Sequence, residues 1–200
     1  YGGARRTELM ETIVKKGASA CALDVTDEKS MSSFVQNILD KEGRIDVLVN
    51  NAGYGSAGSI EEVPPEEIKR QFDVNVFGLG RMIQLVLPIM RKQRSGIIVN
   101  ISSIAGKISS PYLGWYHAAK YSVEAISDAL RMETLPFGIK TVVIEPGMIQ
   151  TAWGVIAAQH VRKYSCGGSY KENAENFAKY YEKRYQTEKR VLSDPKVISR

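Results

Sequence analysis

The chain has 200 residues, of which 44% are hydrophobic and 24% are charged, and this composition excludes disordered, collagen-like and small disulfide-stapled proteins. One globular domain with a sizeable core fits this length. The net charge of +5 lies wholly in residues 161–200, with 10 basic and 5 acidic side chains, because residues 1–160 hold 17 of each. Both signs mix in that tail, which favours a solvated helix face over a site for an anionic partner, and no motif indicates nucleic-acid binding.

The first part of the chain predicts a helix, a strand and a second helix. A helix pattern over Arg5–Lys16 ends at Gly17, because glycine adopts a left-handed cap at little cost. Ala18–Leu23 is typical of a short buried strand. The segment 24–27 then supplies an N-cap for a helix that runs through Lys41 with one apolar face.

The rest of the chain continues the alternation. Ile45–Val49 predicts a buried strand that a glycine-rich loop follows, and Pro64-Pro65-Glu66-Glu67 opens a long helix to Lys92, as proline and acidic residues do in a first turn. The remaining predicted elements are a strand over Gly96–Ile101, a helix over Tyr112–Leu135, a strand over Lys140–Ile144 and the start of a helix over Val191–Arg200.

Short apolar strands separated by long helices predict parallel pairing, because each crossover returns the chain to the same end of the sheet. We therefore expect a doubly wound, Rossmann-like α/β fold with three αβα layers and a single domain over residues 1–200. Ligands bind beyond the carboxyl ends of the strands in such sheets. The loops after Leu23, Val49, Ile101 and Ile144 should line one site.

Three classes of feature are not expected. No apolar run approaches the roughly 20 residues that span a bilayer, so we expect no membrane span, and the start does not resemble a signal peptide. Cys21 and Cys166 are too few for a disulfide framework, which predicts a reducing, cytoplasmic setting. No cysteine or histidine pair has ligand spacing, so no metal site is predicted.

Unusual residues follow the predicted strands. Small residues over 50–53 would let a ligand approach the backbone, although a turn explains them equally well. Ser102 and Ser103 follow the third strand. Tyr116 and Lys120 share a helix face as an i, i+4 pair, so the phenol and the ammonium can project into one crevice, but an isolated pair would more often be a chance surface pairing.

Taken together, these residues resemble the short-chain dehydrogenase/reductase family in its single-domain Tyr-x-x-x-Lys form, over essentially the whole chain. The resemblance implies hydride transfer between a nicotinamide cofactor and an alcohol or ketone. It is carried by Leu23-Asp24-Val25, Asn50-Asn51-Ala52-Gly53, Asn75, Ser103, Tyr116, Lys120, Pro146-Gly147 and Thr151.

The resemblance also implies a role for each catalytic residue. Tyr116 is the general acid/base, and Lys120 lowers the pKa of the phenol and binds the nicotinamide ribose. Ser103 holds the substrate oxygen, and Asn75 holds a water relay behind Lys120. His117 is left out, because a neighbour in sequence points about 100° away on the helix.

Residues 1–6 resemble the end of the second strand of the family's sheet, where an acidic residue binds the 2′-hydroxyl of NAD and a basic residue pairs with the 2′-phosphate of NADP. No acid precedes Glu8 and two arginines lie at the turn after this strand, so the expected cofactor is NADP(H) rather than NAD(H). Arg5 is the preferred contact of the 2′-phosphate and Arg6 the second. Asp24 and Val25 would border the adenine. The other expected cofactor contacts are Asn50, Ala52 and Gly53 at the adenosine ribose, Ile149 and Thr151 at the carboxamide end, and Pro146 and Gly147 beside them.

The chain departs from the family at both ends. The first strand, its glycine-rich phosphate loop and the following helix are absent, so we expect an interior segment of a longer protein. Without them the pyrophosphate would lose a helix N-terminus and the sheet its central strand.

Substrate selection is expected to fall to residues 151–195, an insertion rich in bulky side chains. Phe177, Tyr180, Tyr181 and Tyr185 should share one helical face. A long apolar lid favours a hydrophobic alcohol or ketone, as in hydroxysteroid and retinol dehydrogenases. The alternatives are a 3-oxoacyl-[acyl-carrier-protein] reductase and a non-catalytic nucleotide-binding scaffold. By analogy with the family, two long helices would pair protomers into a homodimer or homotetramer.

Overall fold

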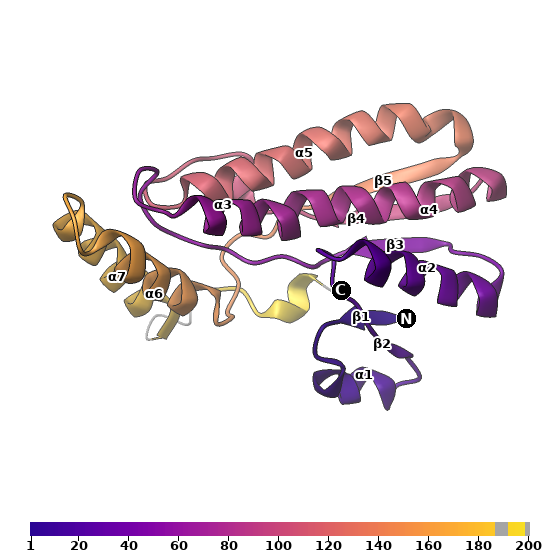
Figure 1. Cartoon of the computed structure of the whole chain (residues 1–200), viewed down its shortest axis with the longest axis horizontal. Helices are drawn as coiled ribbons and strands as arrows, with labels where there is room; N and C mark the ends of the chain where they lie inside the picture. Colours follow the sequence, from indigo (N-terminus) through magenta and orange to yellow (C-terminus); the bar gives the residue numbers. More distant parts are fainter. Residues whose placement is uncertain (187–191, 199–200) are drawn as a thin grey trace.

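The computed structural model describes residues 1–186 and 192–198, and its strands form two parallel sheets (Figure 1). In the first sheet β1 (Gly2–Ala4) pairs with β2 (Ala20–Ala22). The second sheet has the order β3-β4-β5, with β3 at Val47–Asn50, β4 at Gly96–Ile101 and β5 at Ile139–Ile144. Asn50 pairs with Asn100 and Ile101 with Ile144, so the carboxyl ends of the three strands lie level.

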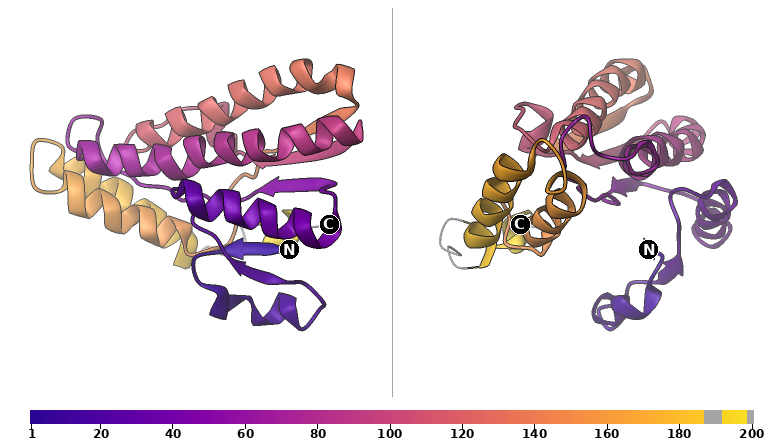
Figure 2. Two further views of the ribbon diagram at one scale, coloured as in Figure 1. Left: turned by 45° about the vertical axis from the view of Figure 1, so that its right-hand side comes forward. Right: turned by 60° about the vertical axis from the view of Figure 1, so that its left-hand side comes forward.

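Helices connect the parallel strands as crossovers. Figure 2 shows α2, α4 and α5 along one side of the strands, with α1 on the other side of β1 and β2. This arrangement confirms the Rossmann-like α/β prediction. The helices are α1 (Glu11–Val14), α2 (Glu28–Glu42), α3 (Pro65–Phe72), α4 (Leu79–Gln93), α5 (Gly114–Thr134), α6 (Trp153–Ser165) and α7 (Lys171–Gln186).

The predicted layers are unequal. Val47 and Val49 point away from the helices and are 51% and 55% exposed, so no described helix covers that face of β3. Layers of helix therefore lie on both sides only around β1 and β2. The two sheets are separate: among the described residues, no strand pairs with both β3 and a strand of the β1-β2 sheet.

Several predicted boundaries are wrong. The helix expected over residues 5–16 is a 3₁₀ turn at Thr7–Met10 followed by one α-turn, because Leu9 and Val14 stay exposed and gain little from packing. Tyr112 adopts a left-handed backbone with φ 62°, so α5 begins only at Gly114. Of the helix expected at the end, a 3₁₀ turn forms at Pro195–Ile198, and residues 191, 199 and 200 lie outside the described chain.

The long predicted helix is α3 and α4 joined by a π-helical segment, Asp73–Gly78. By length and composition alone, this helix of 29 residues could cross a membrane. Its apolar stripe instead packs against β4 and α5, which favours a core helix. The buried residues of the stripe are Leu79, Met82, Ile83, Val86 and Met90.

Candidate active site

The candidate site begins with a buried polar chain that fixes α5 against the sheet. The amide of Asn50 donates to Asn100 Oδ1 at 2.9 Å, and Asn100 donates to the Ser127 hydroxyl at 2.9 Å. Buried amides need such partners, so this chain sets the position of the helix. Asn50 is a predicted cofactor contact, but its side chain supports the sheet here, whereas Ala52 and Gly53 lie exposed beside it.

Tyr116 and Lys120 project from the first turns of α5 toward the end of β4. The Lys120 ammonium is buried, donates to the Ile101 carbonyl at 2.8 Å and lies 5.9 Å from the centroid of the Tyr116 ring. His117 points elsewhere: its Nδ1 contacts the Ala105 carbonyl at 2.9 Å and its Nε2 contacts the Ser110 hydroxyl at 3.0 Å. The omission of His117 from the site therefore agrees with the structure.

Ser103 closes the site from the loop after β4. Its hydroxyl accepts from the Ala105 N–H at 3.1 Å and lies 3.3 Å from the Pro146 carbonyl, to which it donates. The same hydroxyl is within hydrogen-bonding reach of Tyr116. The neighbouring Ser102 hydroxyl is buried and has no hydrogen-bond partner in the described chain. The structure thus brings Ser103, Tyr116 and Lys120 together.

Burial dominates the protonation of this cluster. Burial raises the pKa of Tyr116, and the Ser103 hydrogen bond lowers it by less. Burial also lowers the pKa of Lys120 to about 8, against the opposing charge of Glu124. The lowering of the phenol pKa by Lys120 stays a prediction, and in the chain by itself burial has the larger effect on Tyr116.

Asn75 lies in the π-helical segment and is 2% exposed. Its Oδ1 accepts from the Tyr54 N–H at 2.9 Å, and its Nδ2 donates to the Tyr54 carbonyl at 2.7 Å. A Cβ on Gly53 would lie 3.1 Å from Asn75 Oδ1 and 4.0 Å from Lys120 Nζ. Asn75 therefore fixes the loop that faces Lys120, and its role in a water relay stays a prediction.

The predicted adenine end lies after β1 and β2. The Asp24 carboxylate accepts from the Thr26 hydroxyl at 2.7 Å and from its N–H at 2.9 Å, and these bonds, with a smaller effect of Arg5, lower the pKa of Asp24. Arg5 and Arg6 are exposed at this edge. Gly78 is required here, because a Cβ on it would lie 2.5 Å from the Val25 carbonyl.

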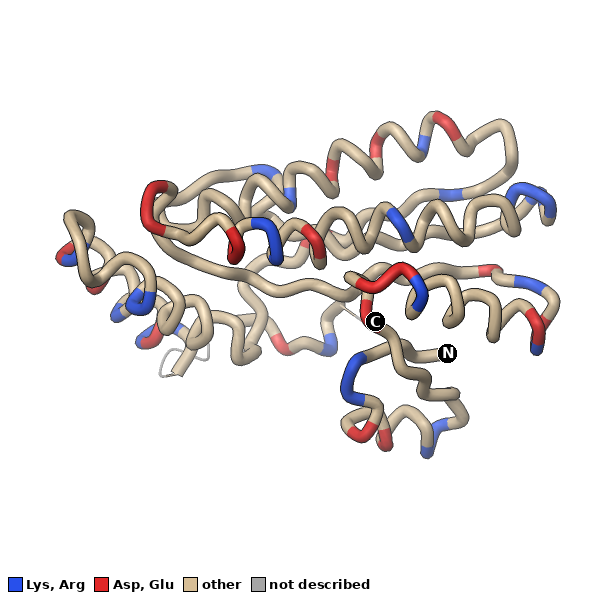
Figure 3. The backbone as a smooth tube through the Cα atoms, viewed as in Figure 1, with Lys and Arg blue, Asp and Glu red and all other residues tan. Residues whose placement is uncertain are grey.

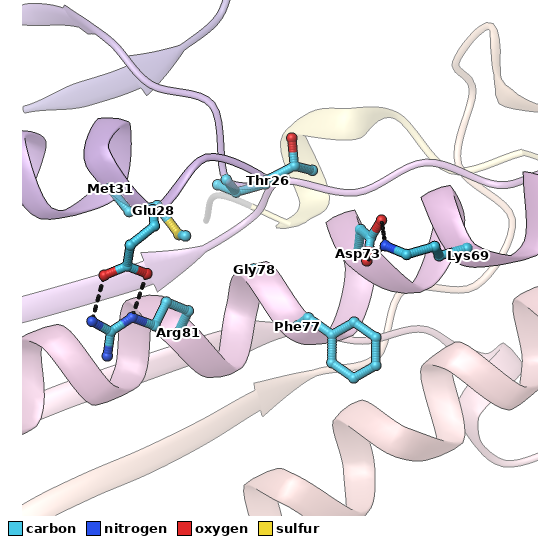
Figure 4. A pocket seen from close by; sticks show the side chains of 9 residues that line it. Thr26, Glu28, Met31, Lys69, Asp73, Phe77, Gly78 and Arg81 are labelled. Atoms are coloured by element: carbon cyan, nitrogen blue, oxygen red, sulfur yellow. Dashed lines mark hydrogen bonds and ion pairs between the residues drawn. The ribbon is translucent and has the colours of Figure 1, made fainter. Parts of the chain in front are cut away.

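A cavity of about 240 Å³ lies beside Val25 and Thr26, which the sequence did not indicate (Figure 4). Its charged lining groups are paired: Arg81 contacts Glu28 at 2.5 Å, and Lys69 contacts Asp73 at 2.6 Å. Because these charges satisfy one another and no catalytic residue lines the cavity, we assign it no part in the chemistry.

The predicted carboxamide end follows β5. Pro146 accepts the Ser103 hydrogen bond, and a Cβ on Gly147 would meet no atom within 4 Å. Ile149 forms an isolated bridge with Ser193. The Thr151 hydroxyl accepts from the Trp153 N–H at 3.2 Å.

These residues fit a nicotinamide cofactor. The Lys120 ammonium has three N–H groups and gives one to Ile101, so it can donate to a ribose. Open space at Gly147 and the exposed backbone of Gly53 permit close approach of a ligand. Among residues 1–186 and 192–198, no group of three side chains could hold a metal ion.

Two helices, α6 and α7, cover the phenol with aromatic rings. The Trp153 ring lies 5.3 Å from that of Tyr116, and Tyr181 and Tyr185 follow at 6.0 and 6.4 Å from Trp153. The sequence analysis did not single out Trp153 among the bulky side chains of residues 151–195, because its contact with Tyr116 joins two distant segments. Tyr180 was expected on the same face, but it is 50% exposed, because it lies next to Tyr181 and turns outward.

The basic tail belongs to this cover. Arg162 of α6 binds Glu175 of α7 at 3.0 Å and also pairs with Glu182. Figure 3 shows basic and acidic positions interspersed along both helices. This pairing supports the interpretation of the tail as a mixed-charge surface.

Comparisons with known proteins agree with this geometry. The short chain dehydrogenase family model matches residues 3–160. The chain is 45% identical to the 3-ketodihydrosphingosine reductase of Bacteroides thetaiotaomicron over 153 residues, which cover 76% of this chain and 55% of that protein. The chain spans about half the length of the curated relatives it matches, such as one from Helicobacter pylori, of which it covers 48%.

Solved structures share the fold. A short-chain dehydrogenase from Streptomyces avermitilis is 41% identical, with a TM-score of 0.73 over 75% of this chain and 56% of that one. A 7α-hydroxysteroid dehydrogenase complexed with NADH and 7-oxo glycochenodeoxycholic acid is 27% identical, with a TM-score of 0.68 over 74% and 60%. The family match over most of its length shows that the chain belongs to the short-chain dehydrogenase family.

Proposed function

We propose that the protein is an NADP(H)-dependent oxidoreductase that transfers hydride between the nicotinamide and a hydrophobic alcohol or ketone. One observation carries this proposal: the Tyr116 phenol lies beside the Ser103 hydroxyl and the buried Lys120 ammonium, under an aromatic cover. Such a cluster can deliver a proton to a carbonyl oxygen as negative charge develops there.

The chain's residues divide the work in this proposal. Tyr116 donates or accepts the proton at the reacting oxygen, and Ser103 donates a hydrogen bond to that oxygen. Lys120 binds the ribose and places a positive charge near the phenol. The bound cofactor supplies the hydride. Asn75 keeps the Gly53–Tyr54 loop against Lys120.

The preference for NADP(H) rests on charge. Arg5 lies at the end of β1 beside Asp24, where it is exposed and can pair with a 2′-phosphate. The hydroxysteroid dehydrogenase of similar fold holds NADH, so the fold alone does not fix this preference. Arg5 is therefore the residue on which the cofactor proposal depends.

The substrate class rests on the cover. The aromatic rings that α6 and α7 place over the phenol and the likeness to a hydroxysteroid dehydrogenase support a ketone with a bulky hydrocarbon part. A second candidate is a long-chain ketone of the 3-ketodihydrosphingosine type, because a relative with that name is 45% identical.

We also propose a cytoplasmic homo-oligomer. Both cysteines are free thiols, as expected in a reducing compartment. Phe77, Tyr121 and Met132, on or beside α4 and α5, are 61%, 44% and 72% exposed, and such apolar positions suit pairing through these helices.

Assays of the purified full-length protein with NADPH and two classes of substrate test the function. We expect turnover of free cyclic ketones, with weaker turnover of a 3-oxoacyl carrier-protein thioester. Turnover only of the thioester, with a strong dependence on salt, would instead support docking of an acidic carrier on the basic tail. Cofactor binding without turnover of any substrate would support the scaffold alternative.

A further inference from the structure

Trp153, the first residue of α6, packs directly against the proposed catalytic phenol. Its ring centroid lies 5.3 Å from that of Tyr116, with 50° between the ring planes. Its backbone N–H donates to the Thr151 hydroxyl at 3.2 Å, which fixes the start of the helix. The indole therefore lies at the start of α6, in contact with the ring of the proposed proton donor.

Glycines and aromatic rings hold the indole in this place. A Cβ on Gly55 would collide with the Trp153 ring, and a Cβ on Gly154 would collide with the Tyr185 ring. Tyr181 and Tyr185 stack with 10° between their planes at 6.1 Å. Because both glycines are needed for these contacts, the aromatic wall is built by close packing.

We propose that Trp153 is the specificity-determining residue of this site and selects ketones that carry a flat ring next to the carbonyl. This inference rests on the proposed function. The Trp153 ring contacts the Tyr116 ring, so a substituent on a carbonyl carbon whose oxygen is held by Tyr116 and Ser103 would lie next to the indole. A planar substituent buries most area against an aromatic face.

Kinetics of the full-length protein with α-tetralone and 2-butanone test this inference. In Trp153→Ala we expect the KM for α-tetralone to rise about tenfold while the KM for 2-butanone changes less than about twofold. Trp153→Phe should keep most of the preference, because the flat wall remains. Equal changes for both ketones would overturn the inference. Trp115→Phe is the matched control, because that indole donates to the Ile60 carbonyl and, as the neighbour of Tyr116 on α5, lies about 100° around the helix from it.

Fluorescence gives a readout that does not need turnover. The chain holds two tryptophans, so the emission of Trp153 is the difference between Trp115→Phe and the double variant Trp115→Phe/Trp153→Phe. With NADP⁺ present, α-tetralone should quench this difference and 2-butanone should not. Quenching that is equal for both ketones overturns the inference, whereas the proposed function fails separately if Tyr116→Phe retains full turnover.

Discussion

The floor of the candidate site and its cover are held in place by different forces. On the floor, Ser103, Lys120 and Asn75 each form hydrogen bonds with the backbone of another segment. In the cover, Arg162 ties α6 to α7, and the cover meets the floor through the Trp153 ring. Hydrogen bonds to the backbone therefore hold the proposed catalytic groups, whereas side-chain packing holds the aromatic cover.

The largest expected effect on stability concerns Lys120, the buried charge of the floor. Its pKa falls to about 8 in the folded chain from 10.5 in the unfolded chain, so the unfolded state binds more protons between these values. The free energy of unfolding, relative to Lys120→Met, should therefore rise by about 3 kcal/mol from pH 8 to 10.5.

Urea unfolding of both proteins at several pH values measures this difference. Lys15→Met is the control for the loss of a surface lysine, because the Lys15 side chain is 78% exposed. A constant difference between wild type and Lys120→Met would mean that the ammonium is solvated in the folded chain.

Substitution of Ser103 should have the next largest effect, and this effect should appear in kcat. Ser103→Ala removes a donor to the developing oxyanion, so kcat should fall about 10²-fold with cofactor affinity kept. Ser102→Ala is a close control, because its buried hydroxyl has no hydrogen-bond partner in the described residues and its loss should be nearly neutral. Equal losses in the two variants would remove Ser103 from the site.

The next prediction concerns Arg5, the proposed contact of the 2′-phosphate of NADPH. Arg5→Ser should raise the KM for NADPH about tenfold and leave the KM for NADH almost unchanged, because only NADPH carries the 2′-phosphate. Arg6→Ser should do less. An equal increase in KM for NADPH and NADH would show that Arg5 does not bind the 2′-phosphate.

The smallest expected effect lies in the cover. Arg162→Met removes ion pairs with Glu175 and Glu182, and the free energy of unfolding should fall by about 1 kcal/mol. Lys179→Met is the control, because Lys179 is 67% exposed and lies 4.0 Å from Glu175. Thermal unfolding measures the stability of both variants. An equal loss of stability in Arg162→Met and Lys179→Met would indicate a general effect of removing a positive charge.

The sequence predicted the alternation of strands and helices and the shared helix face of Tyr116 and Lys120, because both depend on local spacing. The burial predicted for the strand at residues 45–49 is wrong, because Val47 and Val49 are 51% and 55% exposed. The one-turn length of α1 was not predictable, because it depends on how little of Leu9 and Val14 is buried.

The cover and the close approaches could not be predicted, because they join residues far apart in sequence. Gly55 and Trp153 meet only when α6 returns over the loop after β3. The sequence around Gly78 does not indicate that this glycine packs on the Val25 carbonyl. Only the packed structure shows which glycines make room for a partner.

The proton donor assigned to Tyr116 is tested most directly by single-turnover reduction of α-tetralone, measured with NADPH binding in the same samples. Tyr116→Phe should lower the rate of hydride transfer about 10³-fold and keep NADPH affinity, because only the phenol oxygen is lost. Tyr121→Phe, on an exposed part of the same helix, should match the wild type. A Tyr116→Phe protein that reduces the ketone at the wild-type rate would contradict the account.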